Sequence, residues 1–592
     1  MKRISKLLSI LLVLFLLVGC GHESGHESES NKYLEELKNY EVREKNSTLD
    51  DNAEFDAYLD TIFDELVSDN YLYMHFNVAD YKAMGIEKPE VGFGHLVYGL
   101  DEKEFNKTEK QLEDLLAFDY DSLSLRQQYD YDLLHYSLLE TLAGLYYSKY
   151  DLIFSSASQF SDGIVTNLME FAMYDEESEE DFLVVLKDVP NYINEAIEYS
   201  KQQSNDGLYH SDDMLDEEIS YIDNLISSNG KSIYEHYKEY DIYPEVKEIV
   251  ENEVIPSFVT LKDYLNTLYG KTKSDKLALC KIDEGYAEYT YMTSSSNNKD
   301  MEDIYTELIE LYFDWIYNFV SIYQDDENIL DNYEEFLKND EVLNLNVEDL
   351  LEYLRNNSSK RYEYLENANY VVSSLDTLGN TTLGYYVSPP IDNLNQNVIR
   401  VNAKVDSDSY GQMSVFEVMA HEGFPGHLYQ NIYFQQRNPH KFRATQSFVG
   451  YTEGYADLAA YDALEMLDIP EEYKGIARID SITFNSHIIY SIVDLGVNYF
   501  GWSVNTLAKK LDKMMLDGTQ AQELYDVVVA MPGVFVRYGV GFVSHLNLRK
   551  KAMDELGDKF DFVAYDRAII ENGPLPFAIL EGVVEDYINE NK

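Results

Sequence analysis

Most of the chain places hydrophobic residues at helical spacing. In FDAYLDTIFDELV (55–67) the apolar positions recur every three or four residues, which puts them on one face of a helix. Residues 181–202 and 301–323 repeat this spacing, and the 592 residues include only 12 prolines. We therefore expect a mainly α protein whose long helices pack their apolar stripes into a core, and we assign no chemistry to those stripes.

One segment, residues 381–405, departs from the helical pattern. Its two parts LGYYVS and NVIRVNA are rich in β-branched and aromatic residues, and they flank a Pro-Pro pair and a cluster of Asn and Asp. This arrangement predicts a strand, a turn and a second strand. Because an extended peptide can add to a sheet edge through backbone hydrogen bonds, a small β-sheet beside the next helix is a candidate binding edge.

The beginning of the chain has the features of an export signal. Residues 1–6 are basic, and the apolar segment 7–18 is too short to cross a bilayer, so it fits a signal peptide. The following LVGC (17–20) resembles a bacterial lipobox, which implies cleavage before Cys20 and lipidation of that residue. An ordinary signal peptide that ends near a cysteine by chance is the alternative. We expect a signal peptide over 1–19 and an extracytoplasmic protein anchored to the cell membrane by a lipid on Cys20.

The net charge and the cysteine content indicate which partners and which disulfides to expect. With 46 basic and 108 acidic residues, the net charge of −62 argues against nucleic acid, which binds to basic surfaces. The only other cysteine is Cys280, so no intrachain disulfide is expected in the mature protein. We expect a lipidated cysteine and flexible tether over 20–45, an N-terminal helical lobe over 46–375 and a C-terminal catalytic lobe over 376–592. Nothing in the sequence indicates an oligomeric state.

The tether contains a misleading motif. In GHESGHESESN (21–31), residues 22–26 match H-E-x-x-H, the zinc-binding motif of many metallopeptidases. That motif requires a helix, on which positions i and i+4 share a face. The glycines and serines here disfavour a helix, and no apolar face is present to dock one. We therefore reject this segment as a metal site.

A second segment, HEGFPGH (421–427), matches the same motif less well. Its second histidine comes two residues late, and six residues are about 600° of ideal helix, which leaves the two histidines about 120° from a common face. Pro425 breaks the hydrogen-bond ladder, however, and Gly426 can adopt unusual backbone angles. A bulge at these residues would return His427 to the place of the missing i+4 histidine. The sequence therefore predicts a distorted helix at 424–426.

The helix before this segment starts near SVFEVMAHEGF (414–424). Ser414 as N-cap and Glu417 three residues later form a capping-box pattern. In the standard motif, the first histidine binds zinc and the glutamate after it acts on water. This pattern makes His421 a candidate ligand and Glu422 a candidate general base.

A third ligand is expected from the next helix, FVGYTEGYADLAAYDALEML (448–467). Glu453 lies 26 residues beyond His427 and shares a face with Ala456, Asp457 and Ala460. Taken alone, Glu453 would be a surface acid in a chain with 108 acids. With the two histidines it completes a known catalytic zinc set, which leaves one position open to water. We expect one Zn²⁺ bound by His421, His427 and Glu453, and structural or exposed roles for His75, His95, His135, His210, His236, His440, His487 and His545.

These two motifs together carry a family resemblance. HEGFPGH (421–427) followed by EGYA (453–456) resembles the bacterial family known as domain of unknown function 885, which is grouped with the zincin-like metallopeptidases of the gluzincin type. The resemblance implies a large helical zincin-like fold with a small β-sheet beside the zinc-site helix, and many members are exported or are lipoproteins. It also implies that His421, His427 and Glu453 hold the zinc and that Glu422 is the general base.

The resemblance extends over nearly all of the body after the tether. Pro-Gly at 532–533, followed by Tyr538 and Gly541, is similar to the C-terminal pattern of the family, and it makes Tyr538 the candidate donor to the oxyanion. Two positions differ, because Asn498 and Asp566 stand where members of the family often carry histidine. These differences concern substrate orientation and specificity rather than the metal set.

The resulting functional hypothesis is a zinc-dependent hydrolase. We expect a peptidase that cleaves short extracellular peptides, with Glu422 as general base and Tyr538 as oxyanion donor. Arg400 and Arg537 are candidates for binding a peptide carboxylate, and the sequence favours neither. One alternative is a zinc hydrolase of another amide or ester. The other is a catalytically silent lipoprotein that binds peptides or wall fragments, against which the presence of Glu422 argues.

Overall fold

The computed structural model describes residues 31–592 except 44, 46, 376–382 and 403–410. The predicted signal peptide (1–19), Cys20 and the rejected motif at 22–26 therefore lie outside the described residues. Of the described residues, 68% are helical and 3% are in strands, so the predicted mainly α class is confirmed.

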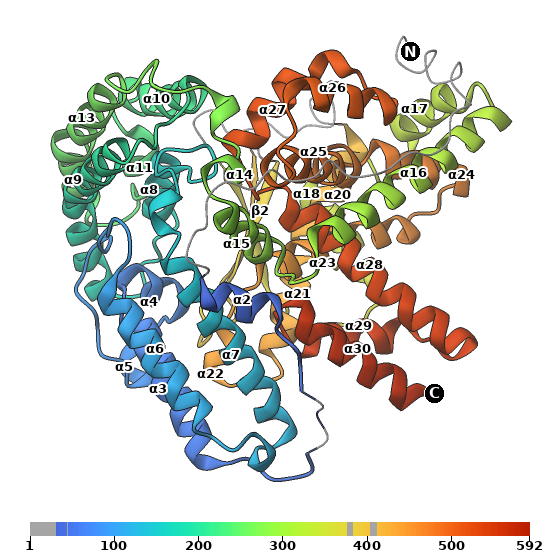
Figure 1. Cartoon of the computed structure of the whole chain (residues 1–592), viewed down its shortest axis with the longest axis horizontal. Helices are drawn as coiled ribbons and strands as arrows, with labels where there is room; N and C mark the ends of the chain where they lie inside the picture. The colour runs from blue at the N-terminus through green and yellow to red at the C-terminus, as the bar shows by residue number, and fades with distance from the viewer. Residues whose placement is uncertain (1–30, 44, 46, 376–382, 403–410) are drawn as a thin grey trace.

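The first half of the chain is a set of helices that lie together in Figure 1, coloured blue to green. Stripe residues Phe55, Leu59 and Phe63 are fully buried, as the spacing predicts. The helices of this half are α2 (Lys32–Lys38), α3 (Ala53–Val67), α4 (Tyr71–Asn77), α5 (Tyr81–Met84), α6 (Glu102–Leu116), α7 (Leu125–Leu145), α8 (Phe160–Met169), α9 (Glu176–Asn205), α10 (Asp212–Ser227), α11 (Lys231–His236), α12 (Tyr243–Ile249) and α13 (Ile255–Leu265).

Helix α2 lies within the segment that was predicted to be a flexible tether. The sequence predicted a flexible tether up to residue 45, but Tyr33, Leu34 and Leu37 of α2 are buried. Asn31 caps this helix, and its side-chain amide donates to the Ala143 carbonyl of α7 at 3.0 Å. The prediction is wrong for residues 32–38, because their apolar side chains dock on the body and order the segment.

The second half contains the sheet and the helices around the candidate site. Its helices are α14 (Leu279–Ile282), α15 (Glu284–Ser295), α16 (Met301–Asp325), α17 (Ile329–Asn339), α18 (Val347–Ser358), α20 (Gln412–Glu422), α21 (His427–Gln435), α22 (Lys441–Ala444), α23 (Val449–Ala463), α24 (Glu471–Asp480), α25 (Ile489–Asp494), α26 (Val504–Lys513), α27 (Ala521–Ala530), α28 (Val536–Leu556), α29 (Phe562–Glu571) and α30 (Phe577–Asn591). Two π-helical segments, η6 (Thr483–Ile488) and η7 (Leu495–Tyr499), flank α25.

Helices α15 and α16 pack against α28, although the sequence placed them in the N-terminal lobe. Figure 1 shows α16 and α17 on the same side of the molecule as α24 and α28. The boundary predicted at residue 375 therefore does not coincide with a break in packing. The assignment of two lobes remains a prediction.

The sheet has three strands, β1 (Tyr370–Leu375), β2 (Gly384–Val387) and β3 (Asn397–Asn402). The strand order is β1-β3-β2, with β3 parallel to β1 and antiparallel to β2. The two predicted strands are confirmed, whereas β1 was not predicted. Strand β2 is an edge, and helix α20 packs against it. The sheet edge and the helix of the first candidate ligand are thus neighbours.

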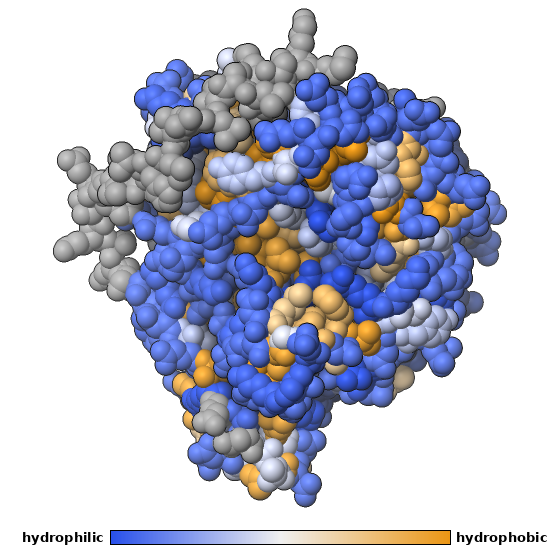
Figure 2. Space-filling view, turned by 90° about the vertical axis from the view of Figure 1, so that its right-hand side faces the viewer, coloured by the Kyte–Doolittle hydropathy of each residue, from blue (hydrophilic) through white to orange (hydrophobic). Residues whose placement is uncertain are grey.

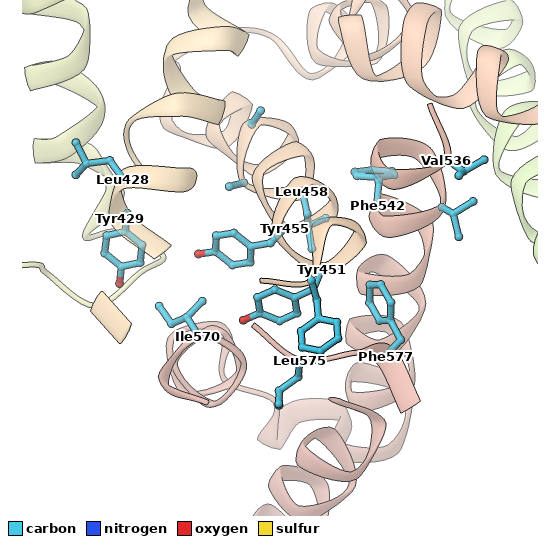
Figure 3. Packing of buried hydrophobic residues seen from close by; sticks show 14 of the residues in the cluster. Leu428, Tyr429, Tyr451, Tyr455, Leu458, Val536, Phe542, Ile570, Leu575 and Phe577 are labelled. Atoms are coloured by element: carbon cyan, nitrogen blue, oxygen red, sulfur yellow. The ribbon is translucent and has the colours of Figure 1, made fainter. Parts of the chain in front are cut away.

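Helices α23 and α28 cross at two glycines. A Cβ built on Gly454 would lie 2.1 Å from the carbonyl carbon of Gly541, and one built on Gly541 would lie 2.1 Å from the Gly450 carbonyl oxygen. Figure 3 shows Tyr451 and Tyr455 of α23 in the same core region as Phe542 of α28. This close contact fixes the helix that carries Glu453 against the helix that carries Tyr538.

Replacing Gly541 by alanine should therefore destabilise the protein. The added methyl group meets backbone atoms that cannot rotate away, and overpacking of this kind costs about 1–3 kcal/mol or more in the free energy of unfolding. The measurement is urea unfolding followed by circular dichroism. The control is Gly163→Ala in α8, where a Cβ meets nothing within 4 Å and alanine favours the helix. An unchanged unfolding midpoint for Gly541→Ala would contradict this account of the crossing.

The surface is predominantly polar. Figure 2 shows one face on which hydrophilic residues dominate, in keeping with the 108 acidic residues of the chain. Among residues 31–592 outside the gaps, no helix is both long enough and apolar enough to cross a bilayer.

Candidate metal centre

The helix is interrupted between the two histidines of HEGFPGH. Helix α20 ends at Glu422 and α21 begins at His427, and the Phe424–Pro425 peptide bond between them is cis. A Cβ on Gly426 would lie 1.8 Å from the His421 carbonyl oxygen, so only glycine allows the backbones to approach this closely. The predicted distortion at 424–426 is confirmed, although it is a break between two helices rather than a bulge within one.

The predicted capping box of α20 is wrong. The helix begins at Gln412 with Gly411 as N-cap, and no side chain caps it. Glu417 instead accepts hydrogen bonds from the backbone N–H groups of Ile482, at 2.8 Å, and Thr483, at 3.2 Å. The Glu417 carboxylate binds these free N–H groups at the start of η6 and therefore does not take part in capping α20. Glu417 thereby ties α20 to the segment that carries His487.

The three predicted ligand residues come together from three helices. His421 Nε2 of α20 and His427 Nε2 of α21 each lie 3.3 Å from Glu453 Oε2 of α23. The ligand atoms of these residues all lie within 4.8 Å of one another. Their side chains are 11%, 13% and 20% exposed, so the group is recessed but not completely buried.

The electrostatics suit a cation. Burial would raise the pKa of Glu453, but the neighbouring His427 and His421 hold it well below the usual range, so the carboxylate is ionised. Burial raises the pKa of Glu422, and the two histidines oppose that effect. Two imidazole nitrogens and an ionised carboxylate that converge on one point are the donor types of a catalytic Zn²⁺ site.

A second carboxylate orients the first histidine. Asp457, one turn after Glu453 on α23, is buried, and its Oδ1 lies 3.0 Å from His421 Nδ1. This contact leaves His421 Nε2 directed at Glu453. The other oxygen, Oδ2, lies 2.7 Å from Nδ1 of His487. Metal-binding histidines commonly use their second ring nitrogen in this way.

The sequence missed both Asp457 and His487 as members of the site. The spacing put Asp457 on the face of Glu453 without giving it a role. His487 was expected to be structural or exposed, and no local motif distinguishes it. It reaches the site because the backbone N–H groups at the start of η6 bind Glu417 and so hold η6 against α20.

If His421, His427 and Glu453 bind zinc as the sequence predicts, replacing Asp457 by asparagine should weaken that binding by about 10–100-fold, because His421 loses its negatively charged partner. Competition with a chelator measures this affinity. The control is Asp462→Asn, since Asp462 is buried on the same helix but pairs with Arg549 and Arg361. That variant should change stability and leave zinc affinity within about twofold. Unchanged zinc affinity in Asp457→Asn would show that the carboxylate does not support the site.

The two predicted catalytic residues flank the ligand group. Glu422 Oε2 accepts a hydrogen bond from the Tyr386 backbone N–H of strand β2 at 2.9 Å. The Tyr538 ring stacks on the His487 ring, with centroids 4.2 Å apart, and lies 6.4 Å from the His421 ring. Burial and then the charge of Glu453 raise the pKa of Tyr538, so its hydroxyl stays protonated.

The two positions that differ from the family pattern lie in other contacts. Asn498 is buried and donates to Asp494 Oδ1 at 2.7 Å and to the Val528 carbonyl at 2.8 Å. Asp566 is buried near Arg549, and burial followed by the charge of Asp462 raises its pKa to about 7. Neither residue belongs to the group of His421, His427 and Glu453.

Comparisons with known proteins give a fold and a family. A structure titled "putative lipoprotein" from Colwellia psychrerythraea has a TM-score of 0.74 at 14% identity, covering 91% of this chain and 99% of that one. A second structure, of a "putative lipoprotein of unknown function" from Shewanella oneidensis, has a TM-score of 0.60 at 13% identity. The match covers 90% of this chain and 100% of that one. These likenesses show a shared fold.

A third structure, of a "putative oligoendopeptidase F" from Bacillus anthracis, has 10% identity over 84% of this chain and 98% of that one, and its TM-score of 0.29 is too low to show a shared fold. No curated protein matches the chain. The family model described as "Bacterial protein of unknown function (DUF885)" matches residues 98–584. Because that match spans most of the 592 residues, the chain belongs to the bacterial DUF885 family.

Proposed function

We propose that the protein is a zinc-dependent hydrolase that cleaves short extracellular peptides. The observation that carries this proposal is the convergence of His421, His427 and Glu453, with Glu422 held beside them at a sheet edge. Side chains from three helices and a backbone N–H group of one strand meet at this point. An isolated surface acid or a packed core histidine would not need this arrangement.

The donor set fits one Zn²⁺. His421 Nε2, His427 Nε2 and a carboxylate oxygen of Glu453 would hold the ion, and Asp457 would support His421 from behind. A zinc ion in such a set supplies a Lewis acid that polarises a carbonyl group and makes a nearby water more acidic.

The residues of the chain supply the proton transfers. Glu422 accepts a proton from the attacking water and passes it to the leaving amine, and the Tyr386 N–H fixes the position of its carboxylate. Tyr538 remains protonated and donates a hydrogen bond to the oxyanion as it develops. His487 stacks on the Tyr538 ring and limits its orientation.

The sheet edge favours a peptide as substrate. In an antiparallel pair, backbone groups of alternate residues face the partner strand. The Leu383 carbonyl accepts from Asn402 N–H at 2.9 Å, so Gly384 and Tyr386 direct their backbone groups away from β3. The N–H of Tyr386 is taken by Glu422, and the remaining outward groups of β2 can pair with an extended peptide.

The chain is proposed to act outside the cytoplasm as a lipoprotein. The LVGC sequence at 17–20 supports lipidation at Cys20. The titles of the two structures with the same fold, both "putative lipoprotein", agree with this proposal. Export to an oxidising exterior is also compatible with a mature chain whose only other cysteine is Cys280.

The proposal is tested by metal analysis combined with digestion of a peptide library. Purified protein should contain one zinc ion per chain, and mass spectrometry should detect peptide cleavage that a chelator abolishes and zinc restores. Parallel assays with other amides and esters test a different hydrolase activity. Peptides that bind without being cut would support a silent binding protein, and protein that takes up no zinc would refute the proposal.

A further inference from the structure

Arg537, which directly precedes the candidate oxyanion donor Tyr538, has no ion-pair partner among the described residues. It is in the first turn of α28, directly before Tyr538, and is half-buried. Its Nε is fully buried and has no hydrogen-bond partner, and within the part of the chain that the structure describes Arg537 forms no ion pair. A desolvated donor without an acceptor is costly, so it needs an explanation, and a bound ligand is one. This is notable in a chain with 108 acids and 46 bases.

Asp494 feels the charge of Arg537 but does not pair with it. Burial raises the pKa of both Asp494 and Tyr538, and the charge of Arg537 opposes that rise at each. The oxygens of Asp494 are already used, however. Oδ1 accepts from Tyr291 and Asn498, and Oδ2 accepts from the Gly533 N–H at 2.9 Å. Asp494 thus holds the Pro-Gly turn that precedes α28 and leaves the guanidinium of Arg537 available.

The other candidate from the sequence, Arg400, is neutralised. Its Nε donates to Glu170 Oε1 at 2.9 Å, its Nη2 donates to Glu170 Oε2 at 2.6 Å, and its Nη1 donates to Ser373. A bidentate pair of this kind leaves no pair of adjacent guanidinium N–H groups free for a second carboxylate. Of the two arginines, only Arg537 can bind a carboxylate without breaking an existing ion pair.

We propose that Arg537 binds the free C-terminal carboxylate of a peptide substrate, so that the enzyme removes a short C-terminal fragment. This inference rests on the proposed function. The planar guanidinium matches a carboxylate in geometry. Its charge acts on the Tyr538 hydroxyl, so the two groups lie near each other. The net charge of −62 repels anionic peptide ends in general, so a local cation is needed to hold one.

The first test compares matched peptides that end in a free acid or in an amide. The parent should prefer the free acid by at least about 30-fold in kcat/KM, because the amide lacks the negative charge that pairs with the guanidinium. Arg537→Gln should remove this preference, so that kcat/KM for the free acid falls to about the value for the amide. Arg537→Lys should keep part of the preference, since lysine carries the positive charge but lacks the planar guanidinium that binds a carboxylate through two N–H groups. The control is Arg567→Gln, which changes an exposed arginine.

The second test measures binding without turnover. In the Glu422→Gln background, calorimetry should show tighter binding of the free acid than of the amide, and adding Arg537→Gln should abolish the difference. Equal cleavage or equal binding of both peptides by protein with intact Arg537 would overturn the inference and leave the proposed function standing. If neither peptide is cleaved by the parent or bound by Glu422→Gln, both the proposed function and the inference fail.

Discussion

Glu422→Gln should lower kcat for peptide hydrolysis by about 10²–10⁴-fold while the protein keeps its zinc, because the amide has the shape of the carboxylate but cannot accept the proton. The side-chain carbonyl of glutamine can still accept the hydrogen bond from the Tyr386 N–H, so the local structure should persist. Initial rates on a peptide identified from the library give kcat, and elemental analysis gives the zinc content.

A matched variant separates this effect from the loss of any buried acid. Glu218 of α10 is also buried, and its carboxylate accepts from the Ser161 N–H at 3.1 Å. Glu218→Gln should therefore leave kcat within about twofold of the parent. If Glu422→Gln hydrolyses peptides as fast as the parent, Glu422 is not the base.

His427→Ala should lower zinc affinity by at least about 10³-fold and abolish turnover, because one of three protein ligands is lost and Glu453 loses a partner at 3.3 Å. Equilibrium dialysis against a zinc buffer measures the affinity. Circular dichroism should show that the helical content is retained, since His427 lies at the first position of α21 and caps no other element.

The rejected motif at 22–26 provides the control for this variant. Replacing both of its histidines, His22 and His26, by alanine removes two imidazoles from the chain but should leave zinc affinity and turnover unchanged. The opposite pattern, in which the double variant loses zinc and His427→Ala retains it, would place the metal in the tether.

Local sequence patterns were sufficient to predict helices, strands and a backbone distortion whose formation depends mainly on neighbouring residues. Helical spacing predicted the buried stripe of α3, and β-branched segments around Pro-Pro predicted β2 and β3. The Pro-Gly pair at 425–426 predicted a distortion that brings His427 to the ligand group. In each case, the preference of a few neighbouring residues agrees with the final packing.

Features decided by distant contacts could not be predicted in this way. The capping box at Ser414 failed because Glu417 is taken by backbone groups 65 and 66 residues away. His487 enters the site through the same contact, and nothing near it in the sequence marks it as special. Strand β1 is ordered by its parallel pairing with β3, and α2 is ordered by docking on α7. Tertiary packing overrode or supplied the structure in all four cases.

The central claim is that one zinc ion is held by His421, His427 and Glu453. X-ray diffraction from crystals of zinc-loaded protein, recorded on both sides of the zinc absorption edge, tests it directly. The account predicts one anomalous peak per chain, about 2.0–2.2 Å from both histidine Nε2 atoms and from a Glu453 carboxylate oxygen. A peak at another group of residues, or no peak at these three in zinc-loaded crystals, would contradict it.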